Sequence, residues 1–116
     1  MTPAPTLTTA RLILRGPQKR DMQAFSHWVT TSARMDAVGG KGTARDAWRG
    51  FLASIGHWQW HGYGYFTVTE RATGIAAGRV GIVHHIEWPQ PGLAWRVFGG
   101  FEGRSFAFEA ACAVRD

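Results

Sequence analysis

The sequence of 116 residues contains a single cysteine, Cys112. One thiol cannot form an internal disulfide, and it cannot supply the several thiolates of a structural zinc site. Because this usage is typical of a reducing compartment, we expect a cytoplasmic protein. We interpret Cys112 as a small buried residue rather than a nucleophile, since alanines surround it in the sequence and no histidine lies near it.

Long apolar runs and runs of like charge are also missing. No apolar run approaches the roughly 20 residues needed to cross a bilayer, and the first ten residues lack the pattern of a signal peptide. We therefore expect no membrane partner. The formal net charge of +5 favours an anionic partner, but no run of basic residues is longer than two. Scattered cations are typical of a solvated surface and give little support to a nucleic-acid partner.

Apolar residues, in contrast, are plentiful. They make up 45% of the chain, with six Trp and seven Phe, which is enough for one hydrophobic core. We predict a single domain over residues 1–116, of the α+β class with a three-layer α/β arrangement. Its largely antiparallel, mixed sheet of about four strands carries three helices in the order β-α-α-β-β-β-α.

Local patterns place these elements. Alternating or β-branched residues predict strands at 11–15, 65–70, 74–85 and 93–98, and apolar residues at helical spacing predict helices at 18–31, 44–60 and 105–115. Thr43 and Asp46 have the spacing of a capping box, Gly62 is a helix stop, and Gly74 allows a tight hairpin turn. Four tryptophans are expected to pack the first two helices against the sheet: Trp28, Trp48, Trp58 and Trp60.

The stretch VFGGFEGRSFAFEA, residues 97–110, leads from a predicted strand through glycines into the last helix. The first N–H groups of a helix have no partner within the helix, and phosphate oxygens satisfy such groups. Gly99 and Gly103 permit a close approach, and Arg104 adds a positive charge. The pattern therefore indicates an anion site, although the same glycines could only turn a loop. The stretch does not match the dinucleotide fingerprint G-x-G-x-x-G.

Three separated segments carry a family resemblance: TLTTARLILRGPQKRDMQAFSHW, GYGYFTVTERATGIAAGRVGI and WPQPGLAWRVFGGFEGRSFAFEAACAV. They resemble, in order and spacing, the Gcn5-related N-acetyltransferases (GNAT), in the branch similar to ribosomal-protein N-terminal acetyltransferases. That branch has an opening T-x-R-L-x-L-R strand, a G-x-x-x-G-x-x-G hairpin and a closing G-[KR]-G-[YF]-A-x-E-A turn. The resemblance covers nearly the whole chain and implies the N-terminal part of the acyl-CoA N-acyltransferase fold.

The resemblance implies transfer of an acetyl group from acetyl-CoA (CoA) to a primary amine, on a small molecule or a protein N-terminus, without a metal. In the family, backbone groups of the strand before the turn pair with the pantetheine arm of CoA, and the amides of the turn bind its pyrophosphate. Carried over to this sequence, the first set is Trp95, Arg96, Val97, Phe98 and Gly99, and the second is Gly103, Arg104, Ser105, Phe106 and Ala107.

The sequence departs from the family at three points. Glu102 and Ser105 stand where the family's turn has other residues, Ser105 in place of the central glycine, and we expect weaker cofactor binding. The chain also ends at Asp116, where the family continues with a strand, a helix and a strand pair. We therefore expect either a piece of a longer protein or a homodimer, formed by strand addition or domain swapping at the exposed edge of the strand at 93–98.

Acetylation of an amine needs a group that takes its proton. Glu87 and His85, in and before the loop that follows the central strand, are the candidates, with His84 as a neighbour. His57 and His61 are four residues apart on a predicted helix, but no third metal ligand is evident. Two other functions remain open: a non-catalytic, CoA-binding or dimerising half-domain, and a basic module associated with RNA or the ribosome.

Overall fold

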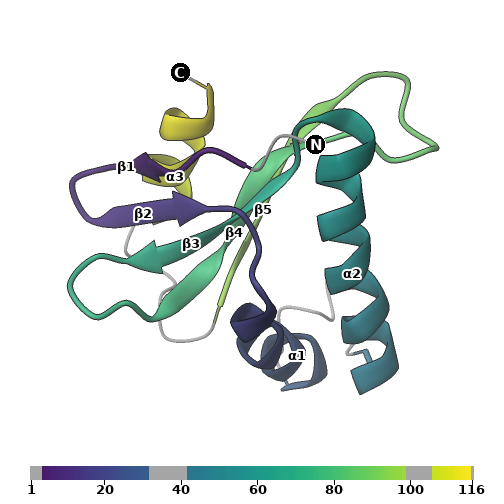
Figure 1. Cartoon of the computed structure of the whole chain (residues 1–116), viewed down its shortest axis with the longest axis horizontal. Helices are drawn as coiled ribbons and strands as arrows, with labels where there is room; N and C mark the ends of the chain where they lie inside the picture. The colour runs from purple at the N-terminus through teal and green to yellow at the C-terminus, as the bar shows by residue number, and fades with distance from the viewer. Residues whose placement is uncertain (1–3, 32–41, 99–105, 116) are drawn as a thin grey trace.

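The computed structural model describes residues 4–31, 42–98 and 106–115 (Figure 1). Its elements follow in the order β1 (Leu7–Thr8), β2 (Leu12–Arg15), the 3-10 helix η1 (Lys19–Asp21), α1 (Met22–Thr31), α2 (Ala44–His61), β3 (Tyr65–Glu70), β4 (Ala76–Val83), β5 (Gly92–Val97) and α3 (Phe106–Arg115). No helix within these ranges is both long and apolar enough to cross a membrane.

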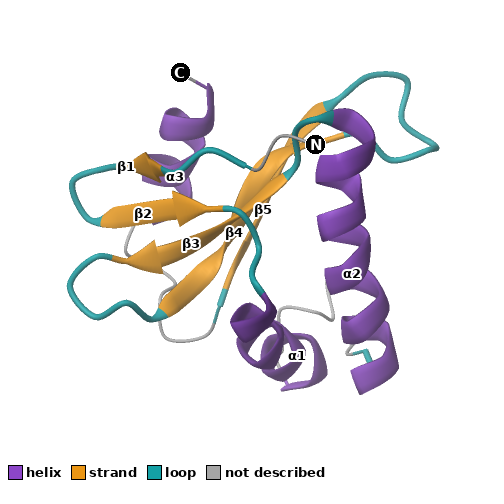
Figure 2. Ribbon diagram, viewed as in Figure 1, coloured by secondary structure: helices purple, strands orange, loops and turns teal. Residues whose placement is uncertain are grey.

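The strands form one sheet in the order β1-β2-β3-β4-β5, and every described pair is antiparallel. α3 packs on one face of the sheet, whereas α1 and α2 lie on the other side (Figure 2). Side chains alternate between the faces: Phe66 and Val68 belong to the core under α3, and Thr67 between them faces the 3-10 helix η1, which precedes α1. β5 is the edge strand of the described sheet.

The boundaries of α2 follow from local chemistry. The Thr43 hydroxyl accepts a hydrogen bond from the Asp46 amide at 3.1 Å, and the Asp46 carboxylate accepts one from the Thr43 amide at 2.9 Å. Gly62 ends the helix with a φ of 80°, a conformation that costs glycine little. The predicted capping box and helix stop are therefore confirmed.

Two glycines of β4 allow its neighbours to approach closely. A Cβ on Gly78 would lie 2.2 Å from the carbonyl oxygen of Arg96 in β5, and a Cβ on Gly81 would lie 2.1 Å from the carbonyl oxygen of Gly64, just before β3. Both distances are far below van der Waals contact. Gly78 and Gly81 belong to the G-x-x-x-G-x-x-G pattern, so this part of the resemblance has a packing reason.

A buried ion pair fixes η1 and α1 to the sheet. Asp21 is 6% exposed, and its carboxylate accepts hydrogen bonds from Arg15 Nη1 and Nη2 at 2.7 and 2.8 Å. It accepts two more from the Gln18 amide at 2.8 Å and the Thr67 hydroxyl at 3.0 Å. Burial alone would raise the pKa of Asp21, but these hydrogen bonds hold it below its ordinary value.

The predicted α+β fold is confirmed, with five strands where about four were expected, because the short β1 pairs with β2. The burial of some side chains differs from expectation. Trp28 is buried as predicted, but Trp48 and Trp60 are 56% and 85% exposed. Their apolar character followed the helical period, yet the described part of the chain places no partner over this face of α2. Cys112 is half-buried.

Candidate active site

Two buried phenylalanines hold the ends of the predicted anion-binding turn. Phe98 packs with the α1–α2 cluster, and its amide donates a hydrogen bond to the Ala77 carbonyl at 2.8 Å. Phe106, at the start of α3, belongs to the other core. Both side chains are occupied by packing, so they fix the two ends of the turn and do not themselves face a ligand. Gly99, Gly103, Arg104 and Ser105 lie outside the described residues.

β5 is the strand that precedes this turn in the sequence. It pairs regularly with β4 along its whole length, from Gly92 opposite Val83 to Val97 opposite Gly78. On its other side the described residues contribute no strand, and an edge strand presents unpaired N–H and C=O groups. Trp95 is 50% exposed on this strand, while Arg96 is half-buried. The edge of β5 is therefore open to an extended ligand.

The space between the sheet and α3 is, by comparison, closed. It contains a cavity of only about 10 Å³, which holds about one water molecule. The lining of this cavity includes Trp95, Val97, Phe106 and the half-buried Ala107. An extended ligand cannot enter this layer without moving it. The open edge of β5 is the accessible route to the start of α3.

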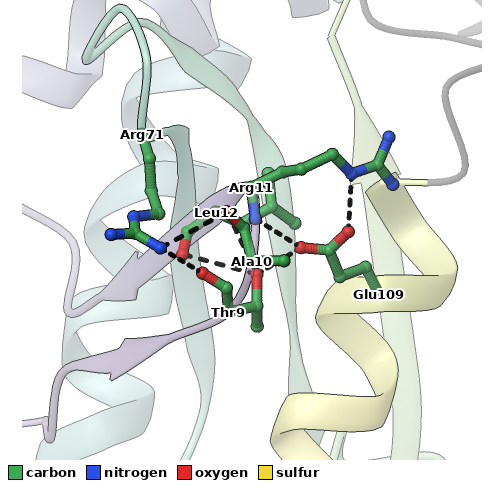
Figure 3. A network of polar contacts seen from close by, with 6 residues as sticks. All are labelled: Thr9, Ala10, Arg11, Leu12, Arg71 and Glu109. Carbon is green, nitrogen blue, oxygen red and sulfur yellow. Dashed lines mark hydrogen bonds and ion pairs between the residues drawn. The ribbon is translucent and has the colours of Figure 1, made fainter.

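Glu109, in the first turn of α3, is tied to the opposite end of the sequence (Figure 3). Its carboxylate accepts hydrogen bonds from the Thr9 hydroxyl, from the Arg11 amide at 2.9 Å and from Arg11 Nε at 2.7 Å. Arg71 Nη1 donates to the carbonyls of Thr9 and Ala10 at 2.9 and 3.3 Å and fixes the same turn.

This network has two consequences for the start of α3. Burial would raise the pKa of Glu109, but the hydrogen bonds from Thr9 and Arg11 lower it below its ordinary value, so the residue is ionised. Its charge is balanced by Arg11, which reduces the repulsion that an anion near the start of α3 would meet. Sequence analysis used Thr9, Arg11 and Glu109 only as pattern residues and missed their contact.

β5 also borders a larger hollow of about 410 Å³, which we call the β5 hollow. It is lined by Tyr65, His85, Trp88, Leu93, Ala94, Trp95 and Arg96. His85 lies in the wall of this hollow, with its ring centroid 4.5 Å from that of Trp88. Glu87 lies in the exposed turn between them and does not line the hollow.

His84 has a different place. Its amide donates to His57 Nε2 at 2.9 Å, and its own Nε2 lies 3.0 Å from the Trp88 carbonyl. His57 Nδ1 lies 2.8 Å from the Tyr63 carbonyl, so His57 carries its proton on Nδ1 and both of its nitrogens are engaged. His61 stacks near both rings; desolvation, followed by the charges of His57 and His84, lowers the pKa of His61. In the described ranges no group of three or more ligands could hold a metal.

Arg79 is a buried cation that sequence analysis missed, because it was counted among scattered surface cations. It lies on β4 directly opposite Arg96, and its Cζ is 4.4 Å from the Phe25 ring centroid and 4.0 Å from that of Tyr65. Its Nε and Nη1 are buried and make no hydrogen bond with the described residues. Burial lowers the pKa of Arg79 to about 10, so the guanidinium stays charged at neutral pH.

An antiparallel sheet with helices on both faces and an open edge strand defines an α+β protein. Solved structures show the same fold. An acetyltransferase from Agrobacterium tumefaciens superposes with a TM-score of 0.88 at 34% identity, over 100% of this chain and 67% of its own. A GNAT-family acetyltransferase from Bacillus anthracis superposes with a TM-score of 0.75 at 19% identity, over 94% of this chain and 63% of its own. A candidate ribosomal-protein-serine acetyltransferase from Vibrio cholerae superposes with a TM-score of 0.76 at 21% identity, over 99% of this chain and 67% of its own.

The sequence itself matches the model of the acetyltransferase (GNAT) domain over residues 11–116. The chain therefore belongs to the GNAT family and is a GNAT-type N-acetyltransferase. It spans about two thirds of the length of the solved structures described above. No curated protein sequence matches it.

Proposed function

We propose that this protein transfers an acetyl group from acetyl-CoA to a primary amine, on a small molecule or a protein N-terminus. The observation that carries the proposal is the continuity of an open edge strand, β5, with the start of α3, in a chain of the GNAT family. When bound, acetyl-CoA supplies the activated acetyl group. The protein's part is to hold that group and to take the proton of the amine.

We assign the binding residues from the family resemblance. The amides of Gly103, Arg104, Ser105, Phe106 and Ala107 bind the pyrophosphate at the start of α3, where the Glu109 carboxylate is paired with Arg11. The backbone edge of Trp95, Arg96, Val97, Phe98 and Gly99 pairs with the pantetheine arm. Because β5 has six residues, an arm that follows it from Val97 to Gly92 covers about 17 Å at about 3.3 Å per residue. On this path it passes the β5 hollow, which four residues of the strand line.

His85 in the wall of the β5 hollow is the residue that we assign to the amine proton. An imidazole accepts a proton near neutral pH and releases it readily. Glu87 is the alternative base, acting through water from its exposed turn. In either case the amine loses its proton to the base as its nitrogen bonds to the acetyl carbon. The carbon–sulfur bond breaks, and CoA leaves as a thiolate that takes up a proton.

Variants at both positions test the assignment. In an acetyl-transfer assay with a panel of amines, we expect His85→Gln to lower kcat by about 10² or more, with an unchanged Kd for acetyl-CoA. His27→Gln, at an exposed position of α1, is the matched control and should retain full activity. A loss in Glu87→Gln instead of His85→Gln would transfer the role to Glu87. Acetyl-CoA binding without transfer to any amine would contradict the proposal.

A second candidate, a CoA-binding or dimerising half-domain, is favoured by apolar side chains along the free side of the molecule. Leu93 and Trp95 on β5 are 40% and 50% exposed, and Phe108 on α3 is 74% exposed. Such an edge favours strand addition by a second copy. Analytical ultracentrifugation at several concentrations distinguishes the two: a stable dimer that binds acetyl-CoA and acetylates nothing supports the half-domain.

A further inference from the structure

The guanidinium of Arg79 is a buried cation without a counterion among the described residues. A charge removed from water is costly unless it is paired. The two aromatic rings of Phe25 and Tyr65 stack on its faces and stabilise it only in part. The carboxylate packed under the same face, Asp21, is already held by both Nη atoms of Arg15. Packing alone does not explain an arginine at this position.

Arg96 places a second cation beside the first. The two residues face each other across β4 and β5, so their side chains leave the same face of the sheet. Within the described ranges, Arg96 Nη1 donates to the Trp95 carbonyl at 2.7 Å and has no carboxylate partner. Like charges directly opposite each other destabilise a strand pair. An anion shared by the two guanidinium groups would remove this repulsion.

The pair adjoins the site of the proposed chemistry. Arg96 and Tyr65 line the β5 hollow together with His85, and the Tyr65 ring also contacts the Arg79 guanidinium. An acceptor in the hollow would therefore have His85 and Arg96 in its lining, and the Arg79 guanidinium stacked on the Tyr65 ring next to that lining. Planar guanidinium groups bind carboxylates with two parallel hydrogen bonds.

We propose that Arg79 and Arg96 bind a carboxylate of the acceptor, so that the preferred substrates are amines that carry a carboxylate group. This inference rests on the proposed acetyl transfer for the amine, whereas the anion site itself does not depend on it. It narrows the acceptor class, which neither the fold nor the family match specifies.

Binding of small anions to the whole chain tests the anion site. With ¹⁵N-labelled protein, succinate should give saturable shifts of the arginine Nε–H signals of Arg79 and Arg96, and succinamide, which has the same shape without charge, should give none. Arg96→Gln should abolish the response, and Arg49→Gln, which removes an equal charge from an exposed position of α2, should retain it. Arg79→Met is the second variant.

Three outcomes would overturn the inference: equal shifts with succinamide, an unchanged response in Arg96→Gln, or tighter binding of inorganic phosphate than of succinate. Kinetics separate the inference from the proposed function. We expect β-alanine to be acetylated with a KM at least about tenfold lower than that of its amide, the loss typical of a charge-assisted hydrogen bond, and Arg96→Gln to remove the difference. Equal KM values would refute the carboxylate site and leave acetyl transfer standing. Succinate binding without any acetyl transfer would support the carboxylate site and refute the proposed acetyl transfer.

Discussion

Replacing Asp21 by Asn would test how the helical layer is held on the sheet. The substitution keeps the shape of the side chain but removes its charge and one acceptor oxygen. The Asp21 carboxylate now receives four hydrogen bonds, two of them from the fork of Arg15. An amide cannot accept both arms of that fork. Because the Arg15 side chain is only 13% exposed, its charge would be left unpaired in a poorly hydrated place.

Breaking a buried ion pair on one side costs about 3 to 5 kcal/mol, a large part of the roughly 5 to 15 kcal/mol that stabilises a small domain. The pH dependence has a definite sign. The pKa of Asp21 is lower in the folded than in the unfolded chain, so its stabilisation is present above the ordinary value of 3.8 and is lost as the pH falls through the folded pKa. The difference in the free energy of unfolding between wild type and Asp21→Asn should therefore become smaller below about pH 4.

Urea unfolding followed by tryptophan fluorescence measures both effects, provided that the m-value is unchanged. Asp46→Asn is a matched control, since Asp46 holds the same capping-box position in α2 but is exposed. We expect Asp46→Asn to lower the free energy of unfolding clearly less than Asp21→Asn does, and to depend less on pH. Equal losses for the two variants, or a cost below about 1 kcal/mol for Asp21→Asn, would refute the claim that the buried pair fixes α1.

Three further substitutions probe the site. Gly78→Ala should push the Arg96 backbone outward, because the added Cβ would lie 2.2 Å from the Arg96 carbonyl oxygen, and should lower the free energy of unfolding in urea by about 1 to 3 kcal/mol. Gly56→Ala is the control, since a Cβ there has nothing within 4 Å, and it should not destabilise the protein. Equal losses for the two variants would count against a close approach of the strands at Gly78. Glu109→Gln should cost about 1 to 2 kcal/mol in the same assay, and no change would show that the tether of α3 is unimportant. Arg79→Met should leave the free energy of unfolding unchanged or raise it by about 1 to 4 kcal/mol, whereas a strong loss would mark Arg79 as a purely structural residue.

Local signals explain which elements the sequence predicts well. The predicted strand at 65–70 coincides with β3, because its β-branched and aromatic residues are bounded by turn residues. The start of α2 is set by Thr43 and Asp46, which are three residues apart. Each of these features depends on neighbours in the sequence, and propensity and spacing report such neighbours directly.

Long-range contacts explain what the sequence does not reveal. Arg11 and Glu109 meet across 98 positions, and no local pattern indicates that contact, although both residues belong to family patterns. The burial of Arg79 depends on the Phe25 and Tyr65 rings from two other elements. The exposure of Trp48 shows the opposite case, a contact that was predicted and is absent from the described part of the chain. An apolar stripe on a helix reports amphipathicity, but it does not report whether a partner covers the stripe.

Acetyl-CoA binding tests the central claim, that the amides at the start of α3 hold the diphosphate of the cofactor. Isothermal titration calorimetry should show one saturable site per chain, with a Kd at least about tenfold lower than that of S-acetylpantetheine, which lacks the diphosphate. In ¹⁵N spectra, the Ala107 amide should shift with acetyl-CoA but not with S-acetylpantetheine. Equal affinities for the two compounds, or no saturable binding of acetyl-CoA, would contradict the account.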